Sequence, residues 1–389
     1  MVVHSHYPLG EPRVEREARA ALEAGYDVSV ICLGSRGEPS GETLDGVAVT
    51  RLPIAHVRGA PPSRVAFEYV AFSIMAAAAV LRILRTRNID VVYVHAPPDF
   101  LIVTALIPRL LRKRVVLDIH DLSPHMFDAR FGGGGLASLV QRCLRIVEVG
   151  ASAVADRVVT VHGQYRDELV SDGVPERKIS VVMNSPDPAV LDRARIAPRP
   201  SSSAFTLAYH GTVNHWYGVD LIVEAVARLE KRMPDVRALI LGEGDALLPV
   251  ERLAEAYGLG ERVEFSRRYL PQSEALRRVA GAGCGVIPNR SSRLNRFALS
   301  SKLLEYVSLE IPVVVANLET LAAHFDSDEV TFFEPGDADS LAEAIAWVAE
   351  HPAEAREKAR RARLRAEAYS WSESRARLLE ALSGRRLSA

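Results

Sequence analysis

The sequence contains little cysteine. Its three cysteines, Cys32, Cys143 and Cys284, lie far apart among 389 residues. Cysteine metal sites have closely spaced ligands, and disulfide frameworks belong mainly to small secreted domains, so neither is expected here. The three thiols are predicted to be small core residues of a protein in a reducing compartment.

An excess of either charge is also missing. The chain has 48 Lys+Arg against 49 Asp+Glu, a formal net charge of -1 at pH 7. A nucleic-acid-binding protein needs a marked positive surface, so no nucleic-acid partner is expected. Lysine is scarce, because only five of the 48 basic residues are lysine. Any lysine at a motif, such as Lys302, is therefore informative.

Long uninterrupted apolar runs are lacking too. The most apolar segment, residues 65–84, contains Glu68 and is rich in alanine. It is interpreted as a buried crossover helix and not as a membrane span. The first residues, MVVHSHYPLGEPR, have no apolar core of signal-peptide length. A cytoplasmic protein is predicted, and peripheral contact with the inner face of the membrane is left open.

What the sequence does have is alternation between short β-rich runs and helical patterns. Its length exceeds what one hydrophobic core usually serves, and 48% hydrophobic with 25% charged residues is typical of a soluble protein. Strands are predicted at residues 28–33, 91–95, 114–121, 157–162 and 178–184, and again after residue 204. Such alternation indicates parallel sheets with both faces covered. The predicted fold class is α/β, with two Rossmann-like doubly wound domains facing across a cleft.

Proline and serine interrupt the alternation near the middle of the chain. We predict an amino-terminal domain at residues 1–187, a linker at 188–204, and a second domain at 205–369. Ser370 and Glu373 match a capping box that starts a terminal helix at 370–389. That helix is either extra packing or a segment that crosses back to the first domain.

One helix start combines residues suited to a nucleotide. Ser300 or Ser301 is expected to cap a helix whose free N–H groups and dipole attract an anion, and Lys302 adds a full charge. Glu305 lies three residues on, where its carboxylate could accept hydrogen bonds from ribose hydroxyls. A lone Glu would be read as a solvated helix face. Together these residues describe one end of a nucleoside diphosphate.

Two further loops are weaker candidates. A predicted strand ends at His210, and Gly211 and Thr212 follow it before a helix opens, although such junctions are common as structural turns. His120 lies at the carboxyl end of another predicted strand, where functional groups collect in wound sheets. His125 and Asp121 share its loop as lesser candidates, and an ordinary histidine in a βα turn is the alternative.

The order of these motifs resembles the GT-B-fold retaining glycosyltransferases of family four, the group 1 glycosyltransferases. Before the linker the resemblance rests on YPLGEPRVEREA, VVLDIHD, ADRVVTVH and KISVVMNSPD. After it, the matching segments are YHGTVNHWYGVDLIVEAV, LGEGD, GVIPN, SKLLEYVSLEIPVVVA and EPGDADSLAEAI. It implies a hexosyltransferase of polysaccharide biosynthesis that moves a sugar, with retention, from a nucleoside-diphosphate sugar to a glycan or lipid-linked acceptor. The nucleotide sugar is then a substrate, and no cofactor is expected.

The resemblance also implies roles for single residues. Glu305 matches the second Glu of the family's paired-Glu motif and would bind the ribose. Lys302 would hold the pyrophosphate, and His120 matches the histidine near the reacting sugar, so these two are the catalytic candidates. Nucleotide-sugar binding would fall to Glu305, Ser300, Ser301, Gly211, Thr212 and Gly10.

Three positions depart from the family pattern. Phe297 stands where the first Glu of the pair is expected, and Trp216 stands where relatives often have a phosphate-binding Arg. Glu310 takes the place of a C-cap glycine, at a cost of ~1 kcal/mol. Three arginines could supply the missing positive charge, although a solvated loop explains them as well: Arg290, Arg293 and Arg296.

No metal site is predicted. Asp337 and Asp339 form the Asp-x-Asp pattern that a divalent ion would need, but they immediately precede a helix and are better explained by N-capping. Lys302 and the helix end would then stabilise the leaving diphosphate, so metal-independent transfer is expected.

The acceptor side is less defined. Arg109, Arg112, Lys113 and Arg114 could contact anionic lipid, or they could simply suit a helix C-terminus. The glycine run at residues 132–135 is read as an acceptor-side loop or as a plain mobile loop. Two rival functions are kept: a sugar-nucleotide epimerase on the same fold, and a non-catalytic nucleotide-sugar-binding partner protein.

Overall fold

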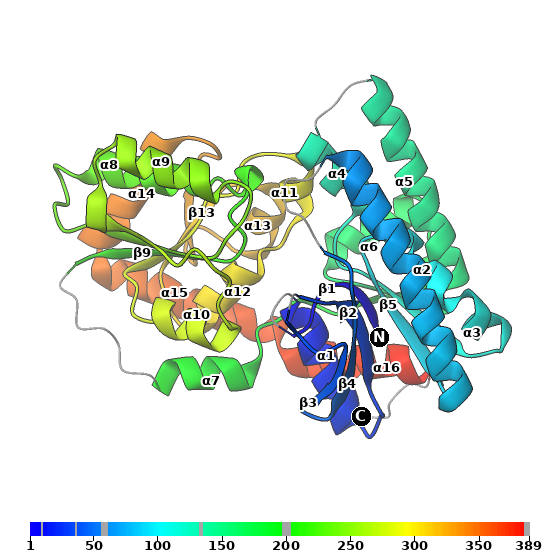
Figure 1. Cartoon of the computed structure of the whole chain (residues 1–389). Coiled ribbons are helices and arrows are strands. Elements are labelled where there is room, and N and C mark those ends of the chain that lie inside the picture. The colour runs from blue at the N-terminus through cyan, green and yellow to red at the C-terminus, as the bar shows by residue number, and fades with distance from the viewer. Residues whose placement is uncertain (9–10, 36, 56–60, 132–134, 197–203, 385–389) are drawn as a thin grey trace. The chain divides into compact units, whose positions relative to one another are not determined.

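The computed structural model describes residues 1–8, 11–35, 37–55, 61–131, 135–196 and 204–384. The chain forms two compact units (Figure 1). The first contains Met1–Asn184 with Ser372–Ala389, and the second contains Ser185–Trp371. Each unit is built on a parallel or mainly parallel sheet, as the alternation of strands and helices predicts.

The first unit has an eight-stranded sheet in the order β3-β4-β2-β1-β5-β6-β7-β8, antiparallel only between β3 and β4. Its strands are β1 Val2–His6, β2 Ser29–Leu33, β3 Gly41–Leu44, β4 Val47–Leu52, β5 Val91–Ala96, β6 Arg114–Ile119, β7 Arg157–Thr160 and β8 Ile179–Val181. Its helices are α1 Pro12–Glu23, α2 Pro62–Thr86, η1 Asp99–Ala105, α3 Leu106–Leu110, α4 Ser123–Phe131, α5 Gly135–Val154, α6 Gly163–Ser171, η2 Glu176–Lys178 and α16 Trp371–Ser383.

The second unit has a six-stranded parallel sheet in the order β11-β10-β9-β12-β13-β14. Its strands are β9 Thr206–His210, β10 Arg237–Leu241, β11 Val263–Phe265, β12 Cys284–Ile287, β13 Val313–Ala316 and β14 Thr331–Phe333. Its helices are α7 Pro188–Ile196, η3 His215–Tyr217, α8 Val219–Leu229, α9 Leu247–Ala256, η4 Gly260–Arg262, α10 Gln272–Val279, α11 Arg293–Phe297, α12 Ser301–Ser308, α13 Glu319–His324, α14 Ala338–Glu350, α15 Pro352–Ala366 and η5 Glu367–Tyr369.

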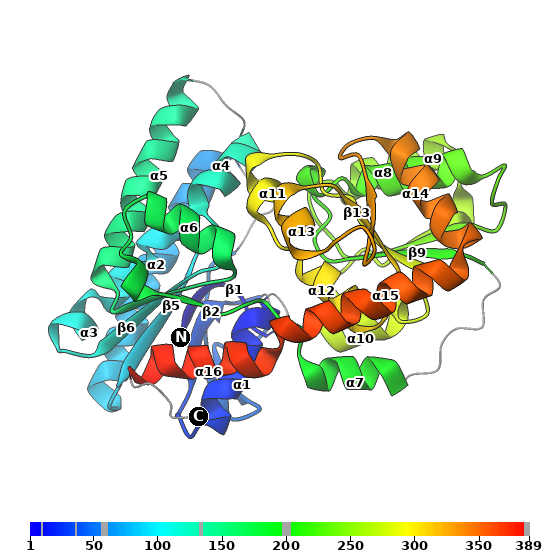
Figure 2. The ribbon, with the colours of Figure 1, turned by 180° about the vertical axis from the view of Figure 1, so that it is seen from behind.

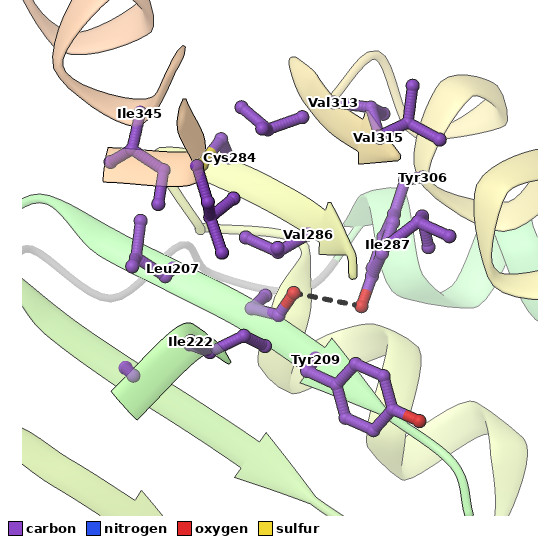
Figure 3. Packing of buried hydrophobic residues seen from close by; sticks show 14 of the residues in the cluster. Leu207, Tyr209, Ile222, Cys284, Val286, Ile287, Tyr306, Val313, Val315 and Ile345 are labelled. Atoms are coloured by element: carbon purple, nitrogen blue, oxygen red, sulfur yellow. Dashed lines mark hydrogen bonds between the residues drawn. The ribbon is translucent and has the colours of Figure 1, made fainter. Parts of the chain in front are cut away.

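The core of the second unit follows from strands that are apolar on both faces. Every residue of β12 and β13 is buried, because helices cover both sides of the sheet. Figure 3 shows Leu207 of β9, Ile222 of α8 and Tyr306 of α12 among these strands. The Tyr306 hydroxyl donates a hydrogen bond of 3.1 Å to the Ala208 carbonyl, so its buried polar group is satisfied.

Both sheets change strand direction at one point. The order runs outward from β1 and β5 in the first unit, and from β9 and β12 in the second. In wound sheets, ligands bind beyond the carboxyl ends of the strands at this switch point. These ends are His6 and Ala96 in the first unit and His210 and Ile287 in the second.

The segment 188–204 differs from a plain linker. Its first residues form α7, with Pro188 as the first helical residue, a position where proline is tolerated. Leu191 and Ala194 are buried in the core of the second unit, so spaced apolar residues outweigh the nearby prolines. Residues 197–203 lie outside the described part. Helix α16 belongs to the first unit, where Leu378 is fully buried.

Two burial predictions were wrong. Helix α2 was predicted to be buried, but only one face is, and Phe67 and Ile74 are 69% and 66% exposed. The apolar character of the whole segment hid this asymmetry. Cys32 and Cys284 are buried as expected, whereas Cys143 is exposed because it lies on the outward face of α5.

Candidate nucleotide-sugar site

Helix α12 starts beside the switch point of the second sheet. Ser300 occupies its N-cap position, but the serine side chain makes no capping hydrogen bond, so the predicted hydroxyl cap was wrong. The Ser300 carbonyl accepts from the Leu303 N–H at 3.1 Å. The first N–H groups of a helix have no intrahelical partner. The backbone of Ser300, Ser301 and Lys302 therefore offers the anion-binding end of a helix.

Lys302 places its ammonium group against aromatic rings and a glycine. Its Nζ lies 4.8 Å from the centroid of the Tyr217 ring and 5.5 Å from that of Tyr209. In the described ranges, no ion pair engages this ammonium. A Cβ added at Gly211 would lie 2.5 Å from Lys302 Cε, and Gly211 has a φ of +108°. Burial lowers the Lys302 pKa, although Glu305 opposes that shift.

Glu305 is 5% exposed and held at both oxygens. Its Oε2 lies 2.5 Å from His210 Nε2, and its Oε1 accepts a 2.5 Å hydrogen bond from Gln272 Nε2. His210 Nδ1 in turn lies 2.9 Å from the Tyr306 hydroxyl. Burial alone would raise the pKa of the carboxyl, but His210, Gln272 and Lys302 outweigh it and lower that pKa. The carboxylate is thus charged and fixed in position, as a hydrogen-bond acceptor for a ribose requires.

Sequence reasoning missed the side-chain roles of His210 and Gln272. A polar residue ending the apolar strand TLAYH was the available signal for His210. Gln272 lies 33 residues from Glu305, and no local pattern links the two.

The Gly211–Thr212 loop is fixed by its neighbours. Gly211 N donates to the Leu241 carbonyl at 2.8 Å, and Thr212 Oγ1 lies 3.0 Å from the Tyr269 hydroxyl. A Cβ added at Gly242 would lie 1.8 Å from the Gly211 oxygen. The LGEG segment, which is weak as a dinucleotide fingerprint, therefore serves as packing for this loop.

The candidate arginines differ in their contacts. Arg290 Nη2 lies 2.5 Å from Asp220, and Arg296 Nε lies 2.6 Å from Glu319. Arg293 is exposed at the start of α11. The buried Asn295 donates to the carbonyl oxygens of Arg290 and Trp216, so it fixes the loop that carries two of the departing positions.

The first unit has a buried charged cluster at its own strand ends. Arg13 of α1 and Asp118 of β6 form two hydrogen bonds of 2.8 and 3.0 Å. Arg13 also lies 3.2 Å from Glu17 and donates to the Val182 carbonyl at 3.0 Å. Arg13 holds the pKa of Asp118 well below its usual range against the opposing effect of burial. This ion pair fixes the acidic centre beneath His120.

Asp118 lies between two histidines that titrate in opposite directions. Burial lowers the pKa of His95 to about 4, even though its Nδ1 lies 3.1 Å from Asp118 Oδ2. His120 Nδ1 lies 3.7 Å from the same oxygen. Burial opposes its charged form, but Asp118, Glu11 and Asp121 outweigh burial and raise the His120 pKa to about 9. His120 is therefore a cationic hydrogen-bond donor at neutral pH.

One group in the described residues has metal-ligand spacing. The ligand atoms of His95, Asp118 and His120 lie within 4.8 Å of one another. Arg13 already occupies both oxygens of Asp118, so a cation there would meet a fixed guanidinium. The cluster does not suit a metal ion. The Asp337 carboxylate accepts from the N–H groups of Asp339 and Ser340, which confirms N-capping at the Asp-x-Asp.

The remaining candidates lie apart from these centres or outside the description. Gly10 and residues 132–134 lie outside the described residues. His125 Nε2 lies 3.2 Å from Glu168, while burial raises the Asp121 pKa. In the basic segment, Arg109 pairs with Asp156 at 2.6 Å, Lys113 donates to Asn88, and Arg114 donates to the Ala381 carbonyl.

Two relatives illustrate the similarity to known proteins. The chain is 24% identical to a phosphatidylinositol N-acetylglucosaminyltransferase protein of Arabidopsis thaliana, over 68% of this chain and 56% of that protein. It is also 24% identical to a GDP-mannose-dependent alpha-(1-6)-phosphatidylinositol monomannoside mannosyltransferase of Mycolicibacterium smegmatis, over 80% of each. The chain thus spans little more than half of the plant relative's length.

Solved structures share the fold. A sucrose-phosphate synthase from Thermosynechococcus elongatus superposes with a TM-score of 0.73 at 18% identity, covering 95% of this chain and 92% of that one. Anabaena HepE in complex with UDP-glucose superposes with a TM-score of 0.71 at 16% identity, covering 99% and 98%. The two parallel-sheet units therefore have the GT-B fold.

Two family models divide the chain between them. Glycosyltransferase Family 4 matches residues 10–190, and Glycosyl transferases group 1 matches residues 193–370. These matches select a transferase over the epimerase and the non-catalytic partner. The chain belongs to the group 1 glycosyltransferases.

Proposed function

We propose that the protein transfers a hexose, with retention of configuration and without a metal ion, from a nucleoside-diphosphate sugar to a lipid-linked or glycan acceptor. The observation that carries this proposal is the start of α12. A lysine without an ionic partner in the described residues stands at a helix N-terminus, and a buried, oriented carboxylate follows it by three residues. Retention follows from the family resemblance.

In this proposal the second unit binds the donor nucleotide. Glu305 accepts the ribose hydroxyls, and the loop at Gly211 and Thr212 lies beside Lys302 as a second phosphate contact. As the bond between the anomeric carbon and the phosphate oxygen breaks, negative charge grows on the diphosphate. Lys302 and the helix N-terminus stabilise it as fixed charge and dipole. The acceptor oxygen bonds to the anomeric carbon, and its proton passes to the leaving phosphate.

The first unit is assigned to the acceptor and the sugar. His120 is protonated at neutral pH and donates a hydrogen bond to the reacting sugar or the acceptor, supported by its raised pKa. Arg290, Arg293 and Arg296 remain secondary phosphate candidates. Of these, the exposed Arg293 needs no ion pair broken before it could bind phosphate.

The comparisons bear on which substrates to test. The mycobacterial relative is named for GDP-mannose, and HepE binds UDP-glucose. The plant and mycobacterial relatives are both named for phosphatidylinositol-based acceptors. UDP and GDP sugars with a phosphatidylinositol acceptor are therefore the first pairs to test. A cytoplasmic site of action suits such substrates.

Thermal unfolding with UDP, GDP, ADP, dTDP or CMP tests the proposal. One nucleotide should stabilise the wild-type protein by about 2.7 kcal/mol at a hundred times its dissociation constant. Glu305→Gln should lose most of that shift, while Glu319→Gln, an exposed control in the same unit, should keep it. If no nucleotide stabilises the folded wild-type protein, the proposal is wrong.

Turnover should then depend on the acceptor and not on a metal ion. With the stabilising nucleotide's sugar and phosphatidylinositol micelles, we expect release of nucleoside diphosphate only when acceptor is present. Addition of EDTA should leave the rate unchanged. A rate that EDTA abolishes and Mg²⁺ restores would contradict the metal-independent part of the proposal.

A further inference from the structure

Exposed apolar side chains gather on one side of the first unit. In the described part of the chain, sixteen large apolar residues are exposed, and eleven of them lie on α2, η1, α3 and α5 or directly after α3. Helix α2 and α5 both contact η1, which leads into α3. Figures 1 and 2 show these elements on the same side of the sheet. Patches of this kind mark interaction surfaces.

Helix α2 supplies the longest apolar stripe. Phe67, Val70 and Ile74 are 69%, 49% and 66% exposed, and their spacing places them on one helix face. The opposite face is packed, with Phe72 and Ala76 fully buried. By length and composition α2 could cross a membrane, but its packed face ties it to the sheet. A helix with one packed and one apolar outward face suits the surface of a bilayer.

The neighbouring helices extend this surface. Leu110 of α3 is 81% exposed, and Leu139 and Ile146 of α5 are 58% and 71% exposed. We call the outward side chains of Phe67, Val70, Ile74, Leu110, Leu139 and Ile146 the α2–α3–α5 face.

The charges on these elements all have one sign at the surface. Their three acidic residues, Glu68, Asp99 and Glu148, are each 2% exposed or less, and Glu68 lies 3.1 Å from His4. The arginines of the same elements are all exposed: Arg64, Arg82, Arg85, Arg109, Arg142 and Arg145. Arg82 and Arg85 continue the outward stripe of α2. The partner of this face must therefore be apolar and anionic.

We propose that the α2–α3–α5 face docks the protein on an anionic lipid bilayer. The apolar side chains enter the boundary between headgroups and acyl chains, and the arginines contact lipid phosphates. A second copy of this chain fits less well, because two such faces would bring arginine against arginine. Docking rests on this surface alone, and it adds to the proposed function the place where a lipid-linked acceptor is met.

Vesicle flotation of the full chain tests the proposal. Vesicles of equal parts phosphatidylglycerol and phosphatidylcholine should carry the protein, while pure phosphatidylcholine should carry much less. The double variants F67Q/I74Q and R82Q/R85Q should each weaken binding to the anionic vesicles about tenfold. Leu248→Gln and Arg252→Gln, exposed positions on α9 of the second unit, are the matched controls and should bind as the wild type does.

Two results would overturn docking. One is wild-type protein that stays with the buffer in both vesicle types. The other is α2 double variants that float as well as the controls. A doubled mass in light scattering that F67Q/I74Q abolishes, without flotation, would assign the face to a second copy. Nucleotide-induced thermal shifts, measured on the same variants, should be unchanged, so docking and donor binding fail or succeed separately.

Discussion

At the scale of single residues, Asp118 separates two histidines that have the same intrinsic pKa. His95 is fully buried at the end of β5 and is held neutral, while His120 retains some exposure and is held charged. The difference arises because burial dominates at His95, whereas three carboxyl groups dominate at His120. One carboxylate thus gives the site a neutral and a cationic imidazole.

This arrangement predicts a measurable titration. By NMR, the His120 imidazole should titrate near pH 9 in the folded protein, and His95 should stay neutral down to about pH 4. Because the folded pKa of His120 is raised, its proton stabilises the fold fully below about pH 6.5, and that stabilisation is lost as pH rises to about 9. Transfer activity should decline over the same upper range. Titration of His120 at or below 6.5 would contradict this assignment.

Local spacing made part of the site predictable. Lys302 and Glu305 lie on one helix turn after a predicted strand end, so sequence alone brings them together. Their supports could not be found that way. Gln272 and His210 reach Glu305 from a loop-borne helix and another strand, and Arg13 reaches Asp118 across 105 residues. Such contacts depend on how the sheet is ordered.

At the scale of elements, the Arg13–Asp118 pair ties α1 to β6. Arg13→Met would leave a buried carboxylate without its partner, and we expect a loss of about 3–5 kcal/mol in the free energy of unfolding. Arg19→Met, on the same helix, breaks the exposed pair with Glu15 and should cost at most about 0.5 kcal/mol. Urea unfolding followed by circular dichroism measures both. Equal losses in the two variants would show that the buried pair does not fix α1.

Helix and strand periodicity predicted where the elements lie better than it predicted their burial. The stretch that forms α2 is apolar almost all round, so composition pointed to the core, while the structure packs only the face of Phe72 and Ala76. Proline near the start of α7 suggested a linker, yet Leu191 and Ala194 anchor a helix. In both cases the neighbouring elements decide the outcome, and one segment of sequence does not specify its neighbours.

At the scale of the whole molecule, the last helix completes the first unit. Leu378 of α16 is fully buried, and the Ala381 carbonyl accepts a 2.8 Å hydrogen bond from Arg114 Nε. Leu378→Ala should destabilise the first unit by about 2–5 kcal/mol. Leu364→Ala, on α15 and 52% exposed, is the matched control. Hydrogen exchange should quicken in β1, β2 and β5 but not in β9, β12 and β13; equal acceleration of both sheets would contradict the division into two units.

The most direct measurement of the central claim is calorimetric binding of the nucleoside diphosphate that stabilises the wild type. Lys302→Met should weaken the diphosphate by about 1.5–3 kcal/mol, the worth of a hydrogen bond to a charged group, and leave the phosphate-free nucleoside unaffected. Lys358→Met is the control, because Lys358 also rests on an aromatic ring, 4.4 Å from the Trp347 centroid. Unchanged diphosphate affinity in folded Lys302→Met would contradict the account of α12.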